Sequence, residues 1–221
     1  DPDAGRTFYV GVMGEGFWTT AVSLAPLPER AAARGAPPHW AGHLGVPDVE
    51  MAVSRIAASG GEQLGPGHPG ANGGLEAVVR DPFGAVLVVS GDTIAPQDEP
   101  VAWHLLLVSD EARAFDWYRT MFGWVAAERV DLGDRLGRHQ RFRWEERGPL
   151  VGSVADLARR PHVHPQWLFC FEVARMAPAL ERVGRLGGQV IDPTLTPEGD
   201  LVSACEDPQG AAFALYQWRS G

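Results

Sequence analysis

The apolar positions of the chain follow the same order of spacings in two separate stretches. Each stretch opens with a strand-like run that begins at a tryptophan and ends at a valine, continues with apolar residues at helical spacing, and closes with further strand-like runs. This order predicts a strand–helix–strand–strand–strand unit whose last two strands form a hairpin. The predicted opening strand, helix and closing strands are 40–46, 49–57, 75–79 and 85–90 in one copy, and 167–173, 176–187, 201–205 and 211–217 in the other.

Short motifs recur at a constant offset and identify the two copies as an internal repeat. The offset is 127 residues for two motifs and 126 for the third, a change that one deleted residue explains. The third motif, Asp-Pro-x-Gly-Ala, has the chemistry of a type I turn and predicts the hairpin. The matched motifs are Trp40 with Trp167, Gly60-Gly61 with Gly187-Gly188, and Asp81–Ala85 with Asp207–Ala211.

A more divergent unit of the same order precedes the second copy. Asp110 is placed to cap a helix that has Phe115, Tyr118 and Phe122 on one face and ends at Gly123. Strands are predicted before and after this helix, near 103–108, 141–144 and 150–154.

The residues before Trp40 predict only the last hairpin of a fourth unit. Phe8–Met13 and Phe17–Leu24 are apolar runs around a Gly-Glu-Gly turn. With repeats of equal length, roughly 35–40 residues would then be missing from the first half. In the alternative interpretation Asp1–Tyr9 is a helix, by likeness to Asp110–Tyr118. We prefer the hairpin, because a helix leaves few residues for three strands before Trp40.

Composition narrows the possible functions. A net charge of −9 argues against a general nucleic-acid-binding protein. No apolar run approaches the roughly 20 residues of a membrane span. Cys170 and Cys205 lie in apolar runs and are too few for a disulfide framework. We therefore expect buried free thiols and a cytoplasmic location. As partners we expect a small-molecule ligand but neither nucleic acid nor a membrane.

These residues carry a resemblance to a known family. Asp110–Trp124, which contains Trp117-Tyr118 and Phe122-Gly123-Trp124, resembles the helix motif of the glyoxalase/bleomycin-resistance/dioxygenase family, the vicinal oxygen chelate superfamily. The two Asp-Pro-x-Gly-Ala hairpins are similar to that family's closing strands. Within the family, the chain resembles the actinobacterial subgroup with two such domains, and the resemblance covers almost the whole chain.

The resemblance implies an α+β fold in which tandem βαβββ units pair into curved mixed sheets around a cavity. We expect two glyoxalase-like domains, joined by an acidic, proline-containing linker near 95–100. The first, 1–96, would lack its opening strand and helix, and the second, 99–221, would be complete. A partner chain could supply the missing elements by swapping, so a homodimer is possible.

Typical enzymes of this family hold one divalent metal, bound by histidine or glutamine on the first strands and by glutamate on a closing strand. Carried onto this chain, these positions fall on residues that cannot bind a metal, and we therefore expect neither a metal nor another cofactor. A shift of register would bring His104 or His43 near these positions, and this alternative stays open. The five positions are Ala41, Val88, Trp103, Leu168 and Ala214.

The second domain is where we expect a ligand. Strand alternation places Glu172 in its cavity as a candidate acid, base or orienting group, paired with Arg141 or Arg143. His43 would face the first cavity as a candidate general base. Trp103 would offer a stacking surface to a planar guest. The predicted ligand-binding residues are Trp103, Leu105, Trp144, Leu168, Cys170, Ala214 and Tyr216.

Three functions are compatible with these observations. The first is a metal-independent protein that binds a planar or aromatic small molecule, as in sequestration or drug resistance. The second is a lyase, isomerase or dioxygenase-like enzyme that uses Glu172 and His43 on a small organic substrate. The third is a regulatory or scaffolding protein with vestigial cavities. The fold supports all three, because function depends on the site and not on the architecture.

Overall fold

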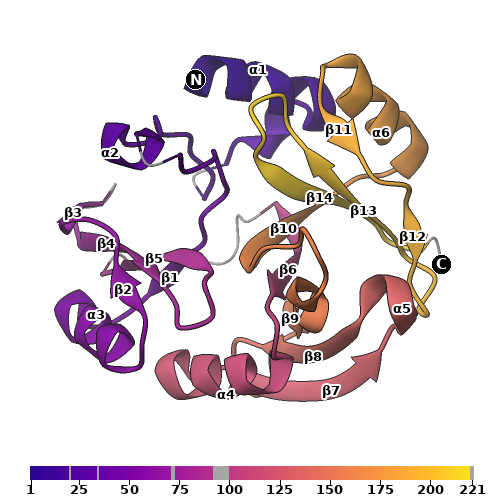
Figure 1. The fold of residues 1–221 in the computed structure, drawn as a ribbon. Helices are drawn as coiled ribbons and strands as arrows, with labels where there is room; N and C mark the ends of the chain where they lie inside the picture. Colours follow the sequence, from indigo (N-terminus) through magenta and orange to yellow (C-terminus); the bar gives the residue numbers. More distant parts are fainter. Residues whose placement is uncertain (20, 34, 71–72, 92–99, 220–221) are drawn as a thin grey trace. The chain divides into compact units, whose positions relative to one another are not determined.

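The contacts within the chain divide it into two compact units. The structure, a computed structural model, describes residues 1–19, 21–33, 35–70, 73–91 and 100–219 (Figure 1). Unit 1 comprises Asp1–Trp40, Ala95–Trp103 and Leu168–Gly221, and unit 2 comprises Ala41–Ile94 and His104–Trp167.

Each unit therefore takes segments from both halves of the repeat. The boundaries 1–96 and 99–221 follow the repeat in the sequence and stay a prediction. The expected linker near 95–100 lies, except for Pro100, outside the described residues.

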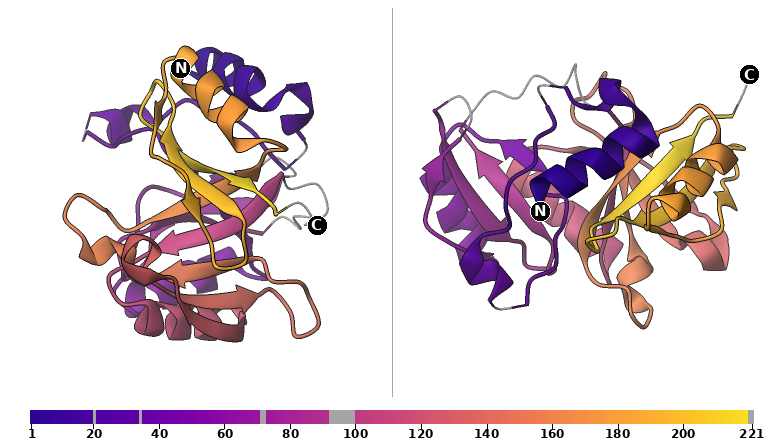
Figure 2. Two further views of the ribbon diagram at one scale, coloured as in Figure 1. Left: turned by 90° about the vertical axis from the view of Figure 1, so that its right-hand side faces the viewer. Right: turned by 90° about the horizontal axis from the view of Figure 1, so that it is seen from above.

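Unit 1 contains one mixed sheet and the helices that cover it. Its elements are α1 (Pro2–Met13), the 3-10 helix η1 (Glu15–Phe17), α2 (Glu29–Ala32), β10 (Gln166–Glu172), α6 (Met176–Arg185), β11 (Gln189–Val190), β12 (Thr194–Leu195), β13 (Leu201–Glu206) and β14 (Ala212–Gln217). The strand order is β11–β13–β14–β10, with β12 also paired to β13. β10 runs parallel to β14, and the other pairs are antiparallel. Helices α1 and α6 lie side by side against this sheet (Figure 2).

The N-terminal segment is a helix, so the strand expected at Phe8–Met13 is wrong. In α1 the buried residues are Gly5, Phe8, Tyr9 and Val12, a spacing that places them on one helical face. The alternative interpretation, in which Asp1–Tyr9 corresponds to Asp110–Tyr118, is the one found in the structure. The helix expected to be missing from the first half is therefore present. Between residues 14 and 42 the described positions contain no strand, so the strand expected at 17–24 is also wrong.

Unit 2 contains two sheets and two long helices. Its elements are β1 (His43–Gly45), α3 (Val49–Ala58), β2 (Glu62–Gln63), β3 (His68–Pro69), β4 (Leu75–Arg80), β5 (Val86–Ser90), β6 (Val101–Leu107, in this unit from His104 onward), α4 (Glu111–Phe122), β7 (Val125–Asp131), α5 (Gly133–Leu136), β8 (Arg138–Arg143), β9 (Gly152–Ala155) and the 3-10 helix η3 (Asp156–Arg159). The strand orders are β1–β5–β4–β2, with β3 beside β4, and β6–β9–β8–β7. In both sheets the opening strand runs parallel to the closing strand.

The helix boundaries follow from the residues that flank them. Asp48 and Asp110 each precede a helix and accept a hydrogen bond from the third helical amide, at 2.9 and 3.1 Å. Gly123 ends α4 in the left-handed conformation, with φ of 77°, which a glycine adopts without steric cost. These features match the helix predicted from the Asp110 motif.

A buried Trp–Tyr–Asp group recurs in both units. In unit 1 the Tyr9 hydroxyl donates to Asp207 Oδ2 at 3.2 Å and accepts from Trp40 Nε1 at 2.8 Å. In unit 2 the Tyr118 hydroxyl donates to Asp81 Oδ2 at 2.7 Å. Trp167, the repeat counterpart of Trp40, meets the Tyr118 ring edge-on, with 5.7 Å between ring centroids.

Each aspartate of these groups also closes its own hairpin turn. Asp81 Oδ1 accepts from the amides of Phe83 and Ala85, both at 2.8 Å. Asp207 Oδ1 does the same with the amides of Gln209 and Ala211. One carboxylate thus holds the hairpin turn with one oxygen and bonds a helix with the other, which ties that helix to the hairpin.

The predicted fold class is confirmed as α+β with strand–helix–strand–strand–strand units in mixed sheets. The predicted closing hairpins correspond to β4–β5 and β13–β14. The opening strand predicted at 40–46 is shorter than expected, since β1 spans only His43–Gly45. Within the described ranges, no helix combines the length and the apolar character needed to cross a membrane.

Candidate functional site

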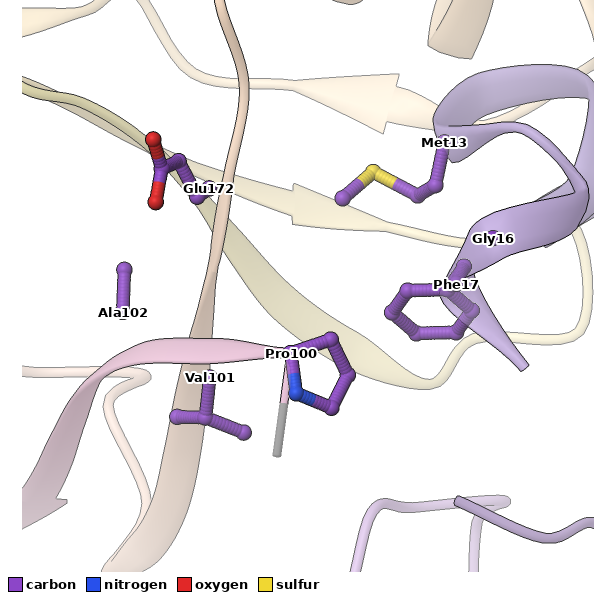
Figure 3. A pocket seen from close by; sticks show the side chains of 7 residues that line it. All are labelled: Met13, Gly16, Phe17, Pro100, Val101, Ala102 and Glu172. Carbon is purple, nitrogen blue, oxygen red and sulfur yellow. The ribbon is translucent and has the colours of Figure 1, made fainter. Parts of the chain in front are cut away.

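A pocket of about 260 Å³ opens in unit 1 where α1 ends, β6 begins and β10 ends. Figure 3 places Met13 and Phe17 on one side of it and Glu172 on the other, with the start of β6 along its base. Its wall is apolar except for the Glu172 carboxylate and the backbone. The lining residues are Met13, Gly16, Phe17, Pro100, Val101, Ala102 and Glu172.

The aromatic side of the pocket is held rigidly by the core of unit 1. α1 ends at Gly14, whose φ of 90° turns the chain into η1 and brings Phe17 back toward the sheet. The Phe17 ring stacks on Tyr9, with 5.7 Å between centroids, and meets Phe171 edge-on at 4.9 Å. Phe17 is therefore a fixed wall of the pocket.

Glu172 is the last residue of β10 and is exposed. Its register partner on β14 is Tyr216. Since Glu172 follows a run of buried residues, its carboxylate stands at the boundary between the apolar interior and solvent. Glu172 alone among the predicted site residues lines this pocket in the part of the chain that the structure describes.

The predicted residues around Glu172 form the interior of the unit 1 sheet. Cys170 and Ala214 are register partners and are both buried. Tyr216 donates to the buried Asp200 at 2.7 Å, which fixes its hydroxyl. Burial raises the pKa of Tyr216 above its usual value, and Asp200 adds to this effect. Burial also raises the pKa of the Cys170 thiol to about 12, so this thiol is unreactive at neutral pH.

The remaining predicted ligand-binding residues are distributed over both units. Trp103 is half-buried and directly follows the pocket residue Ala102. Leu168 is buried in β10, and Leu105 is buried in the part of β6 that belongs to unit 2. Trp144 packs against Trp124 and Phe142 in an aromatic cluster of unit 2, with centroids 5.3 and 5.1 Å away. Its half-buried indole thus packs against the aromatic residues of that unit.

His104 lies on the side of β6 that faces this aromatic cluster. Its ring is 5.2 Å from the Trp144 ring, and its Nδ1 is 2.9 Å from the Val151 carbonyl oxygen. Arg141, an expected partner of Glu172, donates to Glu128 at 3.0 Å within unit 2.

His43 is half-exposed on β1 in unit 2, so the two predicted catalytic residues belong to different units. Its Nδ1 lies 3.1 Å from Glu76 Oε1, and the Ser90 hydroxyl donates to the same oxygen at 3.0 Å. The sequence interpretation did not include Glu76 or assign a role to Ser90. A charged residue at an inward position of an apolar strand was the signal that could have identified Glu76.

The donors required for a metal of the family type are not present at the expected positions. Val88 is the register partner of His43, and Ala214 is that of Cys170, so neither closing strand offers a carboxylate at that point. Hydrocarbon side chains cannot coordinate a metal ion. In the described segments, no three His, Cys, Asp or Glu side chains are grouped closely enough to hold one. The residues do not fit the metal centre that the resemblance implies.

The sequence analysis also missed the wall of the pocket. Met13 and Phe17 were assigned to strands of a hairpin and Pro100 to the linker, while Val101 and Ala102 lay between the predicted linker and the strand at 103–108. The helical spacing of Phe8, Tyr9 and Val12 would have placed Met13 and Phe17 at the end of a helix.

The chain is similar to several known proteins. "Putative glyoxylase CFP32" of Mycobacterium bovis and of Mycobacterium tuberculosis is 24% identical over 243 aligned residues, covering 98% of this chain and 90% of the relative. The structure is similar to glyoxalase I from Zea mays, with a TM-score of 0.37, 16% identity and coverage of 82% of this chain and 68% of that one. It is also similar to the 2,3-dioxygenase LapB from Pseudomonas sp. KL28, with a TM-score of 0.48, 15% identity and coverage of 80% and 69%.

The model of one protein family matches residues 101–215, just over half of the chain. That match covers the unit from β6 to β9 with its helix α4, and the following unit from β10 with its helix α6 as far as residue 215 in β14. The chain belongs to the Glyoxalase/Bleomycin resistance protein/Dioxygenase superfamily.

Proposed function

We propose that this protein binds a small organic molecule in the pocket of unit 1, without a metal. The ligand is a planar or aromatic compound that carries an amine or another cationic group. The observation that supports this proposal is the single carboxylate of Glu172 in a wall whose other side chains are apolar and include the ring of Phe17.

The chemistry of the wall supports a cationic ligand. A cation that approaches Glu172 gains an ion pair, and the face of a nearby aromatic ring adds attraction through its negative quadrupole. An apolar body on the same ligand would replace water against Met13, Val101 and Ala102. The net charge of −9 also raises the local concentration of cations around the protein.

The size of the pocket limits the ligand. A volume of about 260 Å³ lies just below the range of roughly 300–1,000 Å³ that is usual for ligand sites. A single aromatic ring with a short side chain fits this space better than a fused polycyclic compound.

Calorimetric titration with benzylamine tests the proposal, and benzyl alcohol serves as its neutral analogue. We expect benzylamine to bind and benzyl alcohol to bind more weakly. The substitution Glu172→Gln should weaken benzylamine binding about 2–5-fold, the effect of a partly solvated ion pair. It should leave benzyl alcohol unaffected.

Glu206→Gln is the matched control, because Glu206 is also an exposed glutamate at the end of a strand of unit 1. It should not change the affinity. Equal affinity of benzylamine for the wild type and Glu172→Gln would contradict the assignment of the site. Loss of binding after treatment with a chelator would contradict metal independence.

A further inference from the structure

A second group of polar side chains belongs to unit 2 and shares no residue with the proposed ligand pocket. His43, Glu76 and Ser90 come from the three neighbouring strands β1, β4 and β5. In the register of the sheet, Glu76 is opposite Ser90, and His43 is opposite Val88, two residues before Ser90. Because side chains alternate along strands, all three project from the same face of the sheet.

The three side chains differ in exposure in a way that suits proton transfer. Ser90 is fully buried, and the side chain of Glu76 is 11% exposed, whereas that of His43 is 41% exposed. A carboxylate withdrawn from water needs hydrogen-bond donors. His43 and Ser90 supply them, both to Oε1.

The hydrogen bond to Glu76 determines which nitrogen of His43 is available. Because a carboxylate oxygen accepts hydrogen bonds, we assign the imidazole proton of His43 to Nδ1, which then donates a hydrogen bond to Glu76 Oε1. The Nε2 lone pair is then left as the proton acceptor, on an imidazole that solvent can reach. A histidine oriented in this way by a carboxylate is the arrangement of a general base.

The fold does not require these three residues. At the equivalent positions of the other copy stand Cys170, Val202 and Tyr216, with Cys170 opposite Ala214 and Val202 opposite Tyr216 in the same register. That sheet forms without a histidine or a glutamate at these positions. A purely structural role for the His43–Glu76 pair is therefore not dictated by the architecture.

We propose that His43, Glu76 and Ser90 form an acid–base site in which His43 is the catalytic base. Glu76 is a positioning residue, and Ser90 holds Glu76. The substrate class is a small carbon acid, a molecule whose C–H bond is activated by a neighbouring electron-withdrawing group. His43 Nε2 takes the proton, the electron pair of the C–H bond stays with the substrate, and return of the proton from the imidazolium completes the cycle. No oxidant or reductant is needed.

The probe for this site is 5-nitrobenzisoxazole. Removal of its ring C–H proton by a base breaks the N–O bond and releases a coloured cyanophenolate, so absorbance follows the reaction directly. We expect the wild type to accelerate this reaction over buffer and His43→Gln to reduce the rate at least about 10-fold. His68→Gln is the control, because His68 is an exposed histidine of the same unit and should not affect the rate.

Glu76→Val tests the positioning role with the residue found at the equivalent place in the other copy. We expect a reduced rate with a folded protein, as judged by circular dichroism. The ¹⁵N shifts of the His43 ring should move from the Nδ1–H form toward the Nε2–H form, which ties the loss of rate to the orientation of the imidazole by Glu76.

Three results would overturn the proposal. The first is a wild-type rate equal to that of His43→Gln, and the second is an equal loss of rate in His68→Gln. The third is an unchanged ring tautomer in Glu76→Val. Benzylamine binding to the pocket of unit 1 is measured separately, so failure of one proposal does not decide the other.

Discussion

At the scale of single residues, a buried tyrosine hydroxyl bonded to an aspartate holds a helix in each unit. Burial raises the pKa of Tyr118 well above its usual value, and Asp81 adds to this effect, so this tyrosine stays a donor. Replacing Tyr118 by Phe leaves Asp81 Oδ2 without its donor in a buried place. We expect a loss of about 1–3 kcal/mol in the free energy of unfolding, measured by urea denaturation.

A double-mutant cycle with Asp81→Asn separates this bond from changes in packing. If the bond is the cause, the loss from Tyr118→Phe should be smaller when Asp81 is already replaced. Strictly additive losses would indicate that the tyrosine hydroxyl and the aspartate do not interact.

Asp81 also predicts how stability depends on pH. Burial raises its pKa above the ordinary carboxyl value, so the folded chain holds this proton more tightly than the unfolded chain. Between the pKa of Asp81 in the unfolded chain and its higher pKa in the folded chain, the folded state binds more protons than the unfolded state. The contribution of Asp81 to the free energy of unfolding therefore falls as the pH rises through this interval. Lowering the pH from about 7 to about 4 should therefore stabilise the wild type relative to Asp81→Asn. If the free energy of unfolding of the wild type, relative to Asp81→Asn, stays constant or falls as the pH is lowered, the predicted direction is wrong.

The residues of the candidate sites could be predicted only in part from the sequence. Glu172 and His43 were chosen as candidates because strand alternation, counted from the family motif, predicts that they face a cavity, and in the structure both side chains are exposed. Glu76 and Phe17 were not, since their roles depend on which strands pair and where a helix ends. Strand pairing and the position of a helix end depend on tertiary contacts, which the spacing of residues along the sequence does not report.

At the scale of elements, the repeat motifs predicted most strands and the helices α3, α4 and α6. The N-terminal segment was mistaken for a strand because Phe8–Met13 is a continuous apolar run, which fits either structure. The spacing of its buried residues favours the helix, and tertiary contacts reinforce it, since Phe8 and Tyr9 pack edge-on against Phe213 of β14. No local signal within the run reports a partner about 200 residues away.

The caps of the helices give a prediction of their own. Asp110 accepts from the amide of Arg113, so Asp110→Ala should cost about 0.5–2 kcal/mol of unfolding free energy, and Asp110→Asn much less. The equivalent residue before α6 is Arg175, which makes no capping bond. Arg175→Asp should add less than Asp110→Ala removes, because Pro178 stands where the third helical amide would donate. Urea denaturation of the three variants measures these changes, and a gain from Arg175→Asp that equals the loss from Asp110→Ala would contradict this account of the cap.

At the scale of the whole molecule, the units rather than the halves of the repeat should respond together to a local defect. Tyr9→Phe loosens a contact between α1 and the turn of the β13–β14 hairpin. Tyr118→Phe loosens the corresponding contact of α4 with the β4–β5 hairpin. Hydrogen exchange followed by mass spectrometry should therefore show faster exchange in β13–β14 for the first variant and in β4–β5 for the second. Faster exchange of β4–β5 in Tyr9→Phe would indicate that the halves are the cooperative units.

In each unit, a helix from one half of the repeat is hydrogen-bonded to a hairpin from the other half. This arrangement has a consequence for how such sequences diverge. A change at position 207 alters the site that receives the hydroxyl of residue 9, and a change at position 81 does the same for residue 118. In a deep alignment of relatives, covariation should therefore link 9 with 207 and 118 with 81, connecting the two halves of the gene. Gene fission between these halves would separate each tyrosine from its aspartate, and the two products would remain functional only by finding each other.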